Sequence, residues 1–158
     1  MVVGGGPAGS SAAHMAAKNG CTVALIEKEK EIEETVRTSG VTWISDINEF
    51  GIPKECYNPI KKFSFCSPKN YVTITDNVAK AAVLDVRKTY RFLATRSKSS
   101  GSELFTGTNV SEVLKNSAGK CVGVVAKSQG KLIQFNAKVV IDASGFTSIV
   151  AKELGYVT

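Results

Sequence analysis

The stretch that decides the fold is VVGGGPAG at residues 2–9, together with the segment that follows it up to Glu27. Its glycines at positions 4, 6 and 9 form a GxGxxG pattern between a short apolar run and small residues that favour a helix. Asn19-Gly20 ends that predicted helix, and the apolar residues 21–26 then predict a buried parallel strand. The order strand, glycine-rich turn, helix and strand predicts a βαβ unit.

This glycine spacing suits the binding of a dinucleotide. One glycine permits the tight turn, the next lets a pyrophosphate approach, and the third allows helix and strand to pack closely. A helix beginning near Pro7 directs its N-terminal amides at the phosphates. Glu27 ends the next strand, where a carboxylate can accept both ribose hydroxyls and disfavours a 2′-phosphate. FAD or NAD is therefore expected rather than NADP, and a purely structural glycine turn is the alternative.

The remaining segments point to FAD rather than NAD. Residues 28–37 alternate in charge and predict a solvated loop or short helix, and residues 40–60 give mixed signals with helical spacing before Pro53. Residues 61–86 predict two or three strands, and residues 87–97 predict an amphipathic helix. A brief strand at 104–106 and an antiparallel meander of 110–114, 121–126 and 131–135 follow. The sequence then predicts a second buried strand at 138–143 and a short helix to Leu154. A plain NAD-binding domain would instead continue with alternating helices and strands.

These patterns together predict an α/β fold, a Rossmann-like domain with inserted strands and an antiparallel β-meander. Its 158 residues suggest one FAD-binding domain over 1–158, with 60–86 as a β insertion that begins a substrate region. With 43% hydrophobic and 22% charged residues, the chain can bury a core, which excludes a disordered or collagen-like protein.

Charge and cysteine content restrict the partners. The net charge of +6 suits an anionic cofactor, a membrane surface or nucleic acid, but the sequence carries no nucleic-acid-binding module. Four cysteines without a CxxC pair and one histidine predict no metal site, and reduced, mostly buried thiols are expected. No apolar run reaches the roughly 20 residues that span a bilayer. We expect a cytoplasmic protein, for which peripheral membrane contact stays open.

Four blocks of sequence resemble the amino-terminal part of the geranylgeranyl reductase family, within the flavoproteins related to p-hydroxybenzoate hydroxylase. They are VVGGGPAGSSAA with LIEK, VRTSGVT at 36–42, VLDVRKTYRFLATRS at 83–97 and VVIDASGFTSIVAKELG at 139–155. The resemblance implies an incomplete FAD-dependent oxidoreductase that reduces double bonds of an isoprenoid chain, with NAD(P)H as a candidate electron donor. The alternatives are an FAD-dependent monooxygenase or halogenase, or an inactive cofactor-binding fragment.

The same resemblance assigns candidate roles to single residues. It implies a pyrophosphate cradle, an adenosine ribose ligand at Glu27, adenine contacts, two arginines near the flavin, of which the one at the start of the helix after the β insertion contacts the ribityl or phosphate region, and a second cofactor turn. The further candidates are Gly4, Gly6, Pro7, Ala8 and Gly9 for the cradle, Lys28 and the Val110 backbone for adenine, Arg37 and Arg87 for the flavin side, and Asp142 and Gly145 for the second turn. For Asp142 the alternative is a helix cap, and for Lys28, Arg37 and Arg87 it is a solvated charge.

Two positions depart from the family pattern. Family members often carry a cysteine in the VRTSGVT block, where this chain has Thr38-Ser39-Gly40, and related hydroxylases usually carry an aspartate where Ser144 stands. No side chain of the sequence is identified as a general acid or base, so none is assigned to catalysis.

Overall fold

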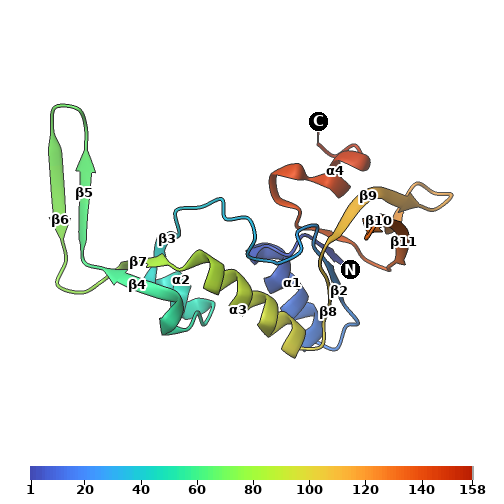
Figure 1. Ribbon diagram of the computed structural model, residues 1–158, viewed down its shortest axis with the longest axis horizontal. Helices are drawn as coiled ribbons and strands as arrows, with labels where there is room; N and C mark the ends of the chain where they lie inside the picture. Colours follow the sequence, from blue (N-terminus) through green and yellow to red (C-terminus); the bar gives the residue numbers. More distant parts are fainter. Residues whose placement is uncertain (158) are drawn as a thin grey trace. The chain divides into compact units, whose positions relative to one another are not determined.

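Residues 1–157 are described in a computed structural model of the chain (Figure 1). The chain divides into two compact units. The first joins Met1–Thr35 to Tyr90–Thr158, and the second is Val36–Thr89. Helix α3 (Val86–Ser99) begins in the second unit and continues into the first.

A four-stranded parallel sheet forms the centre of the first unit. Its order is β12 (Ile141–Asp142), β1 (Val2–Val3), β2 (Ala24–Ile26) and β8 (Glu103–Phe105). Helix α1 (Pro7–Lys18) connects β1 to β2 and has Asn19 as its C-cap, which confirms the predicted βαβ unit. The predicted strand at 104–106 is the outer strand β8 of the same sheet.

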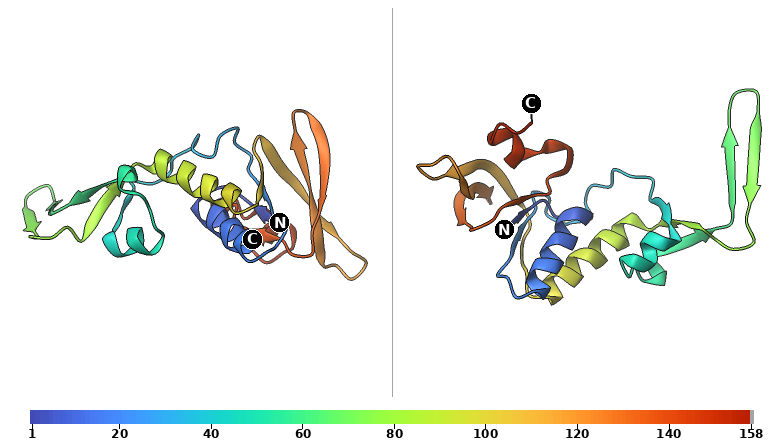
Figure 2. Two further views of the ribbon diagram at one scale, coloured as in Figure 1. Left: turned by 90° about the horizontal axis from the view of Figure 1, so that it is seen from below. Right: turned by 180° about the vertical axis from the view of Figure 1, so that it is seen from behind.

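Two apolar layers cover opposite faces of this sheet, because successive side chains of a strand point to opposite sides. Val2 and Leu25 pack with the buried alanines of α1, whereas Val3 and Ile26 pack with Val124 and other residues of the meander. Figure 2 shows α1 on one side of the parallel strands and the meander on the other. The glycine-rich turn thus leaves the sheet between two packed layers.

The antiparallel meander is confirmed, with longer strands than predicted. It consists of β9 (Thr108–Lys115), β10 (Cys121–Ser128) and β11 (Lys131–Asn136), with β10 in the middle. Beyond β12, a 3-10 turn at Gly145–Thr147 leads into the short helix α4 (Ile149–Glu153), which is also as predicted.

The second unit contains two small antiparallel sheets. In the first, β7 (Ala81–Leu84) lies between β3 (Val41–Trp43) and β4 (Tyr57–Ile60), with helix α2 (Ile44–Glu49) and a 3-10 turn at Lys54–Cys56 between β3 and β4. The strands predicted in 61–86 are confirmed, but β3 and β4 were not predicted. Pro59 argues against a strand in the sequence, because proline has no N–H to donate to a neighbouring strand. Strand β4 tolerates it because it lies at the edge of its sheet.

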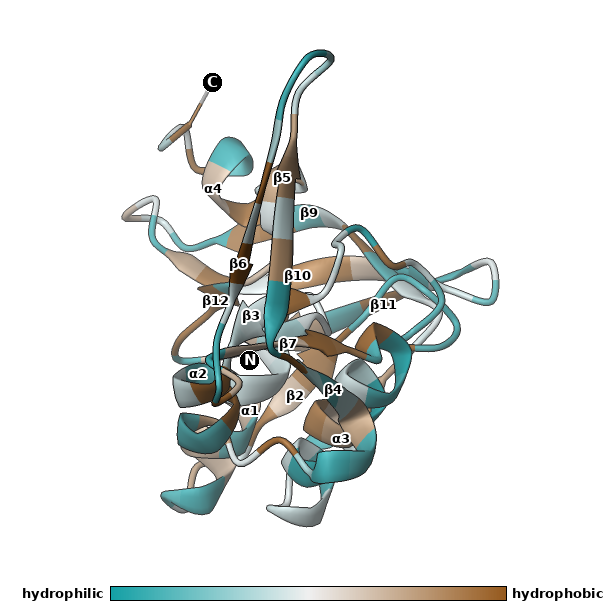
Figure 3. Ribbon diagram, turned by 90° about the vertical axis from the view of Figure 1, so that its left-hand side faces the viewer, coloured by the Kyte–Doolittle hydropathy of each residue, from teal (hydrophilic) through white to brown (hydrophobic). Residues whose placement is uncertain are grey.

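The second small sheet is a hairpin of β5 (Lys62–Cys66) and β6 (Tyr71–Thr75). Phe63 pairs with Ile74 and Phe65 with Val72, so these four side chains share one face, and hydrophobic colour runs along both strands in Figure 3. The described part of the chain leaves Phe65 61% exposed. This hairpin therefore presents an uncovered apolar face within the second unit.

Two predictions about burial are wrong. The predicted buried strand 138–143 is a strand only at Ile141–Asp142, and Val139 is 66% exposed, because β12 is an outer strand of the sheet. Of the four free cysteines only Cys56 is buried, whereas Cys21 and Cys66 are exposed. Within residues 1–157, no helix combines the length and apolar character needed to cross a membrane.

Candidate dinucleotide-binding site

The glycine-rich turn begins where β1 ends. Gly4 donates its N–H to the carbonyl of Ile26 over 2.8 Å and adopts a φ of +103°, a conformation that L side chains rarely take. A Cβ at this position would lie 2.3 Å from the carbonyl oxygen of Ala143 in the second turn. Gly4 is therefore required both by its backbone conformation and by the close approach of the two turns.

The third glycine of the pattern serves packing. A Cβ on Gly9 would lie 1.8 Å from the carbonyl oxygen of Gly4, so a side chain here would push α1 away from β1. Gly5 is crowded too, because its Cβ position lies 2.2 Å from Cδ1 of Ile32. Both contacts are made within the protein and need no ligand to explain them.

Gly6 differs from its neighbours in leaving space that no protein atom fills. Its φ of −63° suits any residue, and a Cβ at this position would meet nothing within 4 Å. Gly6 is also the N-cap of α1, with no side-chain cap hydrogen bond, and Pro7 begins the helix. Uncapped amides at a helix N-terminus beside open space form an anion site, which fits the pyrophosphate of a dinucleotide.

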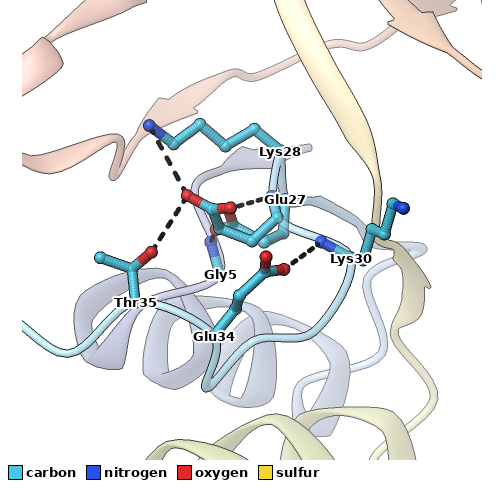
Figure 4. Close-up of polar contacts among 7 residues, drawn as sticks. Gly5, Glu27, Lys28, Lys30, Glu34 and Thr35 are labelled. Carbon is cyan, nitrogen blue, oxygen red and sulfur yellow. Dashed lines mark hydrogen bonds and ion pairs between the residues drawn. The ribbon is translucent and has the colours of Figure 1, made fainter.

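Glu27 joins the turn to the end of β2 (Figure 4). Its Oε2 accepts the backbone N–H of Gly5 over 2.6 Å, and its Oε1 accepts the N–H of Glu29 over 2.9 Å. A carboxylate has about four acceptor sites, so each oxygen can still accept a hydroxyl. The structure thus brings the glycine-rich turn and the predicted ribose ligand together.

The acidic segment, residues 28–35, continues from Glu27. Lys28 is half-exposed, with its Nζ 4.0 Å from Oε1 of Glu29 (Figure 4). Glu33 lies in the predicted solvated run but is only 8% exposed, and Arg91 of α3 donates its Nε–H to Oε1 of Glu33 over 2.6 Å. Sequence reasoning missed this pair because its two members stand 58 residues apart and no sequence pattern links them.

Val110 lies in β9, two residues after Thr108, which contacts Glu27. Thr108, at the start of β9, donates its N–H to the carbonyl of Glu27 over 2.9 Å. The Val110 side chain is buried with Val3 and Ile26 in the layer beneath the meander. Contact between its backbone and adenine stays a prediction.

The second turn is built around Asp142. Its Oδ1 accepts the N–H and the hydroxyl of Ser144, and its Oδ2 accepts the N–H of Ala151 in α4 over 2.8 Å. Burial by itself raises the pKa of Asp142, but the hydrogen bonds from Ser144, Ala151 and Val150 outweigh it and bring the pKa below its usual value. This geometry matches the capping alternative, while Gly145 begins the turn with a φ of +66°.

The two arginine candidates, Arg37 and Arg87, belong to the second unit and are exposed there. Their approach to a cofactor stays a prediction. In the VRTSGVT block, Gly40 is buried, and a Cβ on it would lie 2.9 Å from the carbonyl oxygen of Leu84. The block therefore packs against β7 within its own unit.

A parallel sheet with this turn, this helix N-terminus and an acid at the end of the second strand defines a dinucleotide-binding protein of the Rossmann type. Residues 1–153 match the FAD dependent oxidoreductase family, and the chain belongs to that family. FAD is therefore the cofactor that the family match supports.

Among curated relatives, the digeranylgeranylglycerophospholipid reductase of Methanocaldococcus jannaschii is 34% identical over 98% of this chain and 40% of its own length. A shorter relative, an uncharacterized protein encoded in the nifH2 5′ region of Methanosarcina barkeri, is 32% identical over 98% of this chain and 86% of its length. The chain thus spans about 40% of the length of the reductases that it matches.

Solved structures agree on the fold. A geranylgeranyl bacteriochlorophyll reductase-like protein from Thermoplasma acidophilum superposes with a TM-score of 0.83 and 29% identity, over 92% of this chain and 38% of that protein. The flavin-dependent brominase Bmp2, as a triple mutant, superposes with a TM-score of 0.78 over 96% of this chain and 40% of its own. Its identity of 21% shows the shared fold alone.

Proposed function

We propose that the chain carries the FAD-binding part of an oxidoreductase that reduces double bonds in the isoprenoid chains of a lipid. The observation that carries this proposal is the 34% identity to a digeranylgeranylglycerophospholipid reductase across 98% of the chain. The brominase likeness concerns the fold, so a halogenase or monooxygenase reaction has less support.

In this proposal the turn of Gly4, Gly6, Pro7, Ala8 and Gly9 holds the FAD pyrophosphate, and Glu27 accepts the adenosine ribose hydroxyls. The open space at Gly6 and the lone pairs that the Glu27 carboxylate does not use within the protein support this assignment. The finer assignments follow the family resemblance. They place Lys28 and the Val110 backbone at adenine, Asp142 and Gly145 in the second cofactor turn, and Arg37 and Arg87 on the flavin side.

The chemistry belongs to the cofactor, and the protein orients it and excludes water. FAD held by this turn would, once reduced, supply a hydride for one carbon of a double bond, and with a proton on the other carbon the alkene would gain two electrons and two protons. We propose NAD(P)H as the source of the electrons. Residues 60–86 would begin the substrate region, and the uncovered apolar face of the β5–β6 hairpin supports an apolar substrate.

Peripheral contact with a membrane is part of the same proposal. A lipid substrate resides in a bilayer. Four lysines lie in or next to the apolar hairpin in the sequence and could contact anionic lipids, namely Lys61, Lys62, Lys69 and Lys80. Sedimentation with anionic and neutral phospholipid vesicles tests this contact. If all of the protein stayed in the supernatant with both kinds of vesicle, this contact would be contradicted.

The function is tested with purified chain and added FAD. We expect a protein-bound flavin spectrum and bleaching by NAD(P)H without oxygen. Failure to take up FAD would contradict the flavoenzyme proposal. Flavin uptake without bleaching by NAD(P)H would favour a cofactor-binding module and would contradict NAD(P)H as the source of the electrons.

A further inference from the structure

The acidic segment covers one side of the glycine-rich turn. Cδ1 of Ile32 lies 2.2 Å from the Cβ position of Gly5, and the carbonyl of Glu29 accepts the N–H of Gly107 over 2.7 Å. Within the segment, Glu29 also donates its N–H to Glu27. The carboxylate that faces the ribose in the proposed function is thus braced by a segment without helix or strand.

Glu33 connects this segment to α3 through an ion pair with Arg91. Its carboxylate is removed from water, and both Nε and Nη2 of Arg91 approach its Oε1. A buried carboxylate is costly without a paired cation, and Arg91 supplies one to Glu33. Arg91 is held in turn by α3, which buries Leu93 and Ala94 in the first unit.

We propose that the ion pair between Glu33 and Arg91 positions the FAD site, by holding the acidic segment against Gly5 so that Glu27 stays aligned with the adenosine ribose. Both residues act through Glu27 and are positioning residues. The inference rests on the proposed binding of FAD at the glycine-rich turn. It concerns two residues to which the family resemblance assigns no role.

The test compares the variants Glu33→Gln and Arg91→Met, and their double variant, with the wild-type chain. Because each single change breaks the same pair, we expect the Kd for FAD to rise about tenfold in both, and no further in the double variant. The matched controls are Glu31→Gln in the same segment and Lys98→Met on the same helix, since both side chains are exposed. In the controls the Kd should stay within about twofold of wild type.

Hydrogen exchange supplies a readout that does not depend on FAD. In Glu33→Gln the amides of residues 28–35 should exchange faster, while those of α1 keep their wild-type rates. A pair that only stabilises the fold would lower the Tm without changing the FAD Kd of the folded protein, and that result would overturn the proposal. Additive losses in the double variant would overturn it as well.

The two proposals fail in distinguishable ways. A wild-type chain that takes up no FAD contradicts the proposed function, and faster exchange in Glu33→Gln would then still show that the ion pair holds the segment. Unchanged exchange together with unchanged FAD affinity would overturn the positioning role alone.

Discussion

The backbone N–H of Gly5 donates to the carboxylate of Glu27 across 2.6 Å, so the middle of the glycine-rich turn is bonded to the end of the neighbouring strand. Hydrogen bonds to an ionised acceptor are shorter and stronger than neutral ones. The turn proposed to bind the pyrophosphate and the carboxylate proposed to bind the ribose are therefore held together by the protein itself.

Glu27→Gln should weaken this connection. An amide keeps one acceptor oxygen and turns an NH₂ group toward a backbone N–H, either that of Gly5 or that of Glu29. Hydrogen bonds to charged groups contribute about 1.5–3 kcal/mol, so FAD affinity should fall roughly ten- to hundredfold. Titration of flavin fluorescence measures it, with the exposed Glu31→Gln as control. Wild-type affinity in Glu27→Gln would contradict a ribose role for this side chain.

Gly6→Ala should separate binding from stability. The new methyl group meets no protein atom within 4 Å and the backbone conformation accepts alanine, so the free energy of unfolding should fall only by the preference of an N-cap for glycine over alanine, about 1 kcal/mol or less. The methyl group would occupy the space assigned to the pyrophosphate, and FAD affinity should drop at least about tenfold. Urea unfolding and flavin titration on the same preparation test both parts. Undiminished FAD binding would show that the phosphates lie elsewhere.

Gly9→Ala should have the opposite profile. Its Cβ would lie 1.8 Å from a backbone oxygen of Gly4, which cannot move without shifting β1 or α1. Overpacking of this kind typically costs about 1–3 kcal/mol, and the urea midpoint should fall accordingly. Gly6→Ala, which adds the same methyl group three residues earlier, is the matched control. Equal stability of the two variants would contradict the packing described for this turn.

Asp142 should make the second turn sensitive to acid. Its hydrogen bonds to Ser144, Ala151 and Val150 lower its pKa in the folded state despite the opposing effect of burial. The ionised form therefore stabilises the fold fully above the ordinary pKa of about 3.9, and this contribution is lost as the pH falls further, through the folded-state pKa.

The comparison variant is Asp142→Asn, which cannot ionise. The difference in Tm between wild type and Asp142→Asn should be constant from pH 7 to about pH 5 and should shrink below about pH 4. Thermal unfolding at each pH measures it. A difference that persists unchanged at the acidic end would show that the charge of Asp142 contributes nothing to the turn.

The four thiols should differ in reactivity. Burial raises the pKa of Cys56, with smaller contributions from Glu55 and Asp85, and the thiolate is the reactive form. The exposed Cys21 and Cys66 should react quickly with a disulfide reagent in native protein, whereas Cys56 should react only after unfolding. Mass spectrometry of the labelled peptides identifies the sites, and rapid native labelling of Cys56 would contradict its burial.

The predictions that succeeded rest on local patterns. Glycine spacing and the run of small residues predicted α1, alternation predicted the meander, and the charged amphipathic stretch predicted α3. The failures lie where distant contacts decide. Strand β4 was not predicted because Pro59 argues against a strand, and only the sheet order shows that β4 is an edge strand. The apolar residues near Val139 predicted a buried strand, whereas β12 is an outer strand of its sheet and Val139 is exposed.

For the site, the sequence by itself determined the class of ligand, because the glycines and Glu27 stand at distances along the chain that only a βαβ unit converts into one binding site. Only the tertiary structure decided what each residue does there. It separates Gly6, which leaves space for a ligand, from Gly4 and Gly9, which are required by packing inside the protein. It also buries Glu33 against Arg91, because the stability of a charge depends on its neighbours in space, and those neighbours are remote in the sequence.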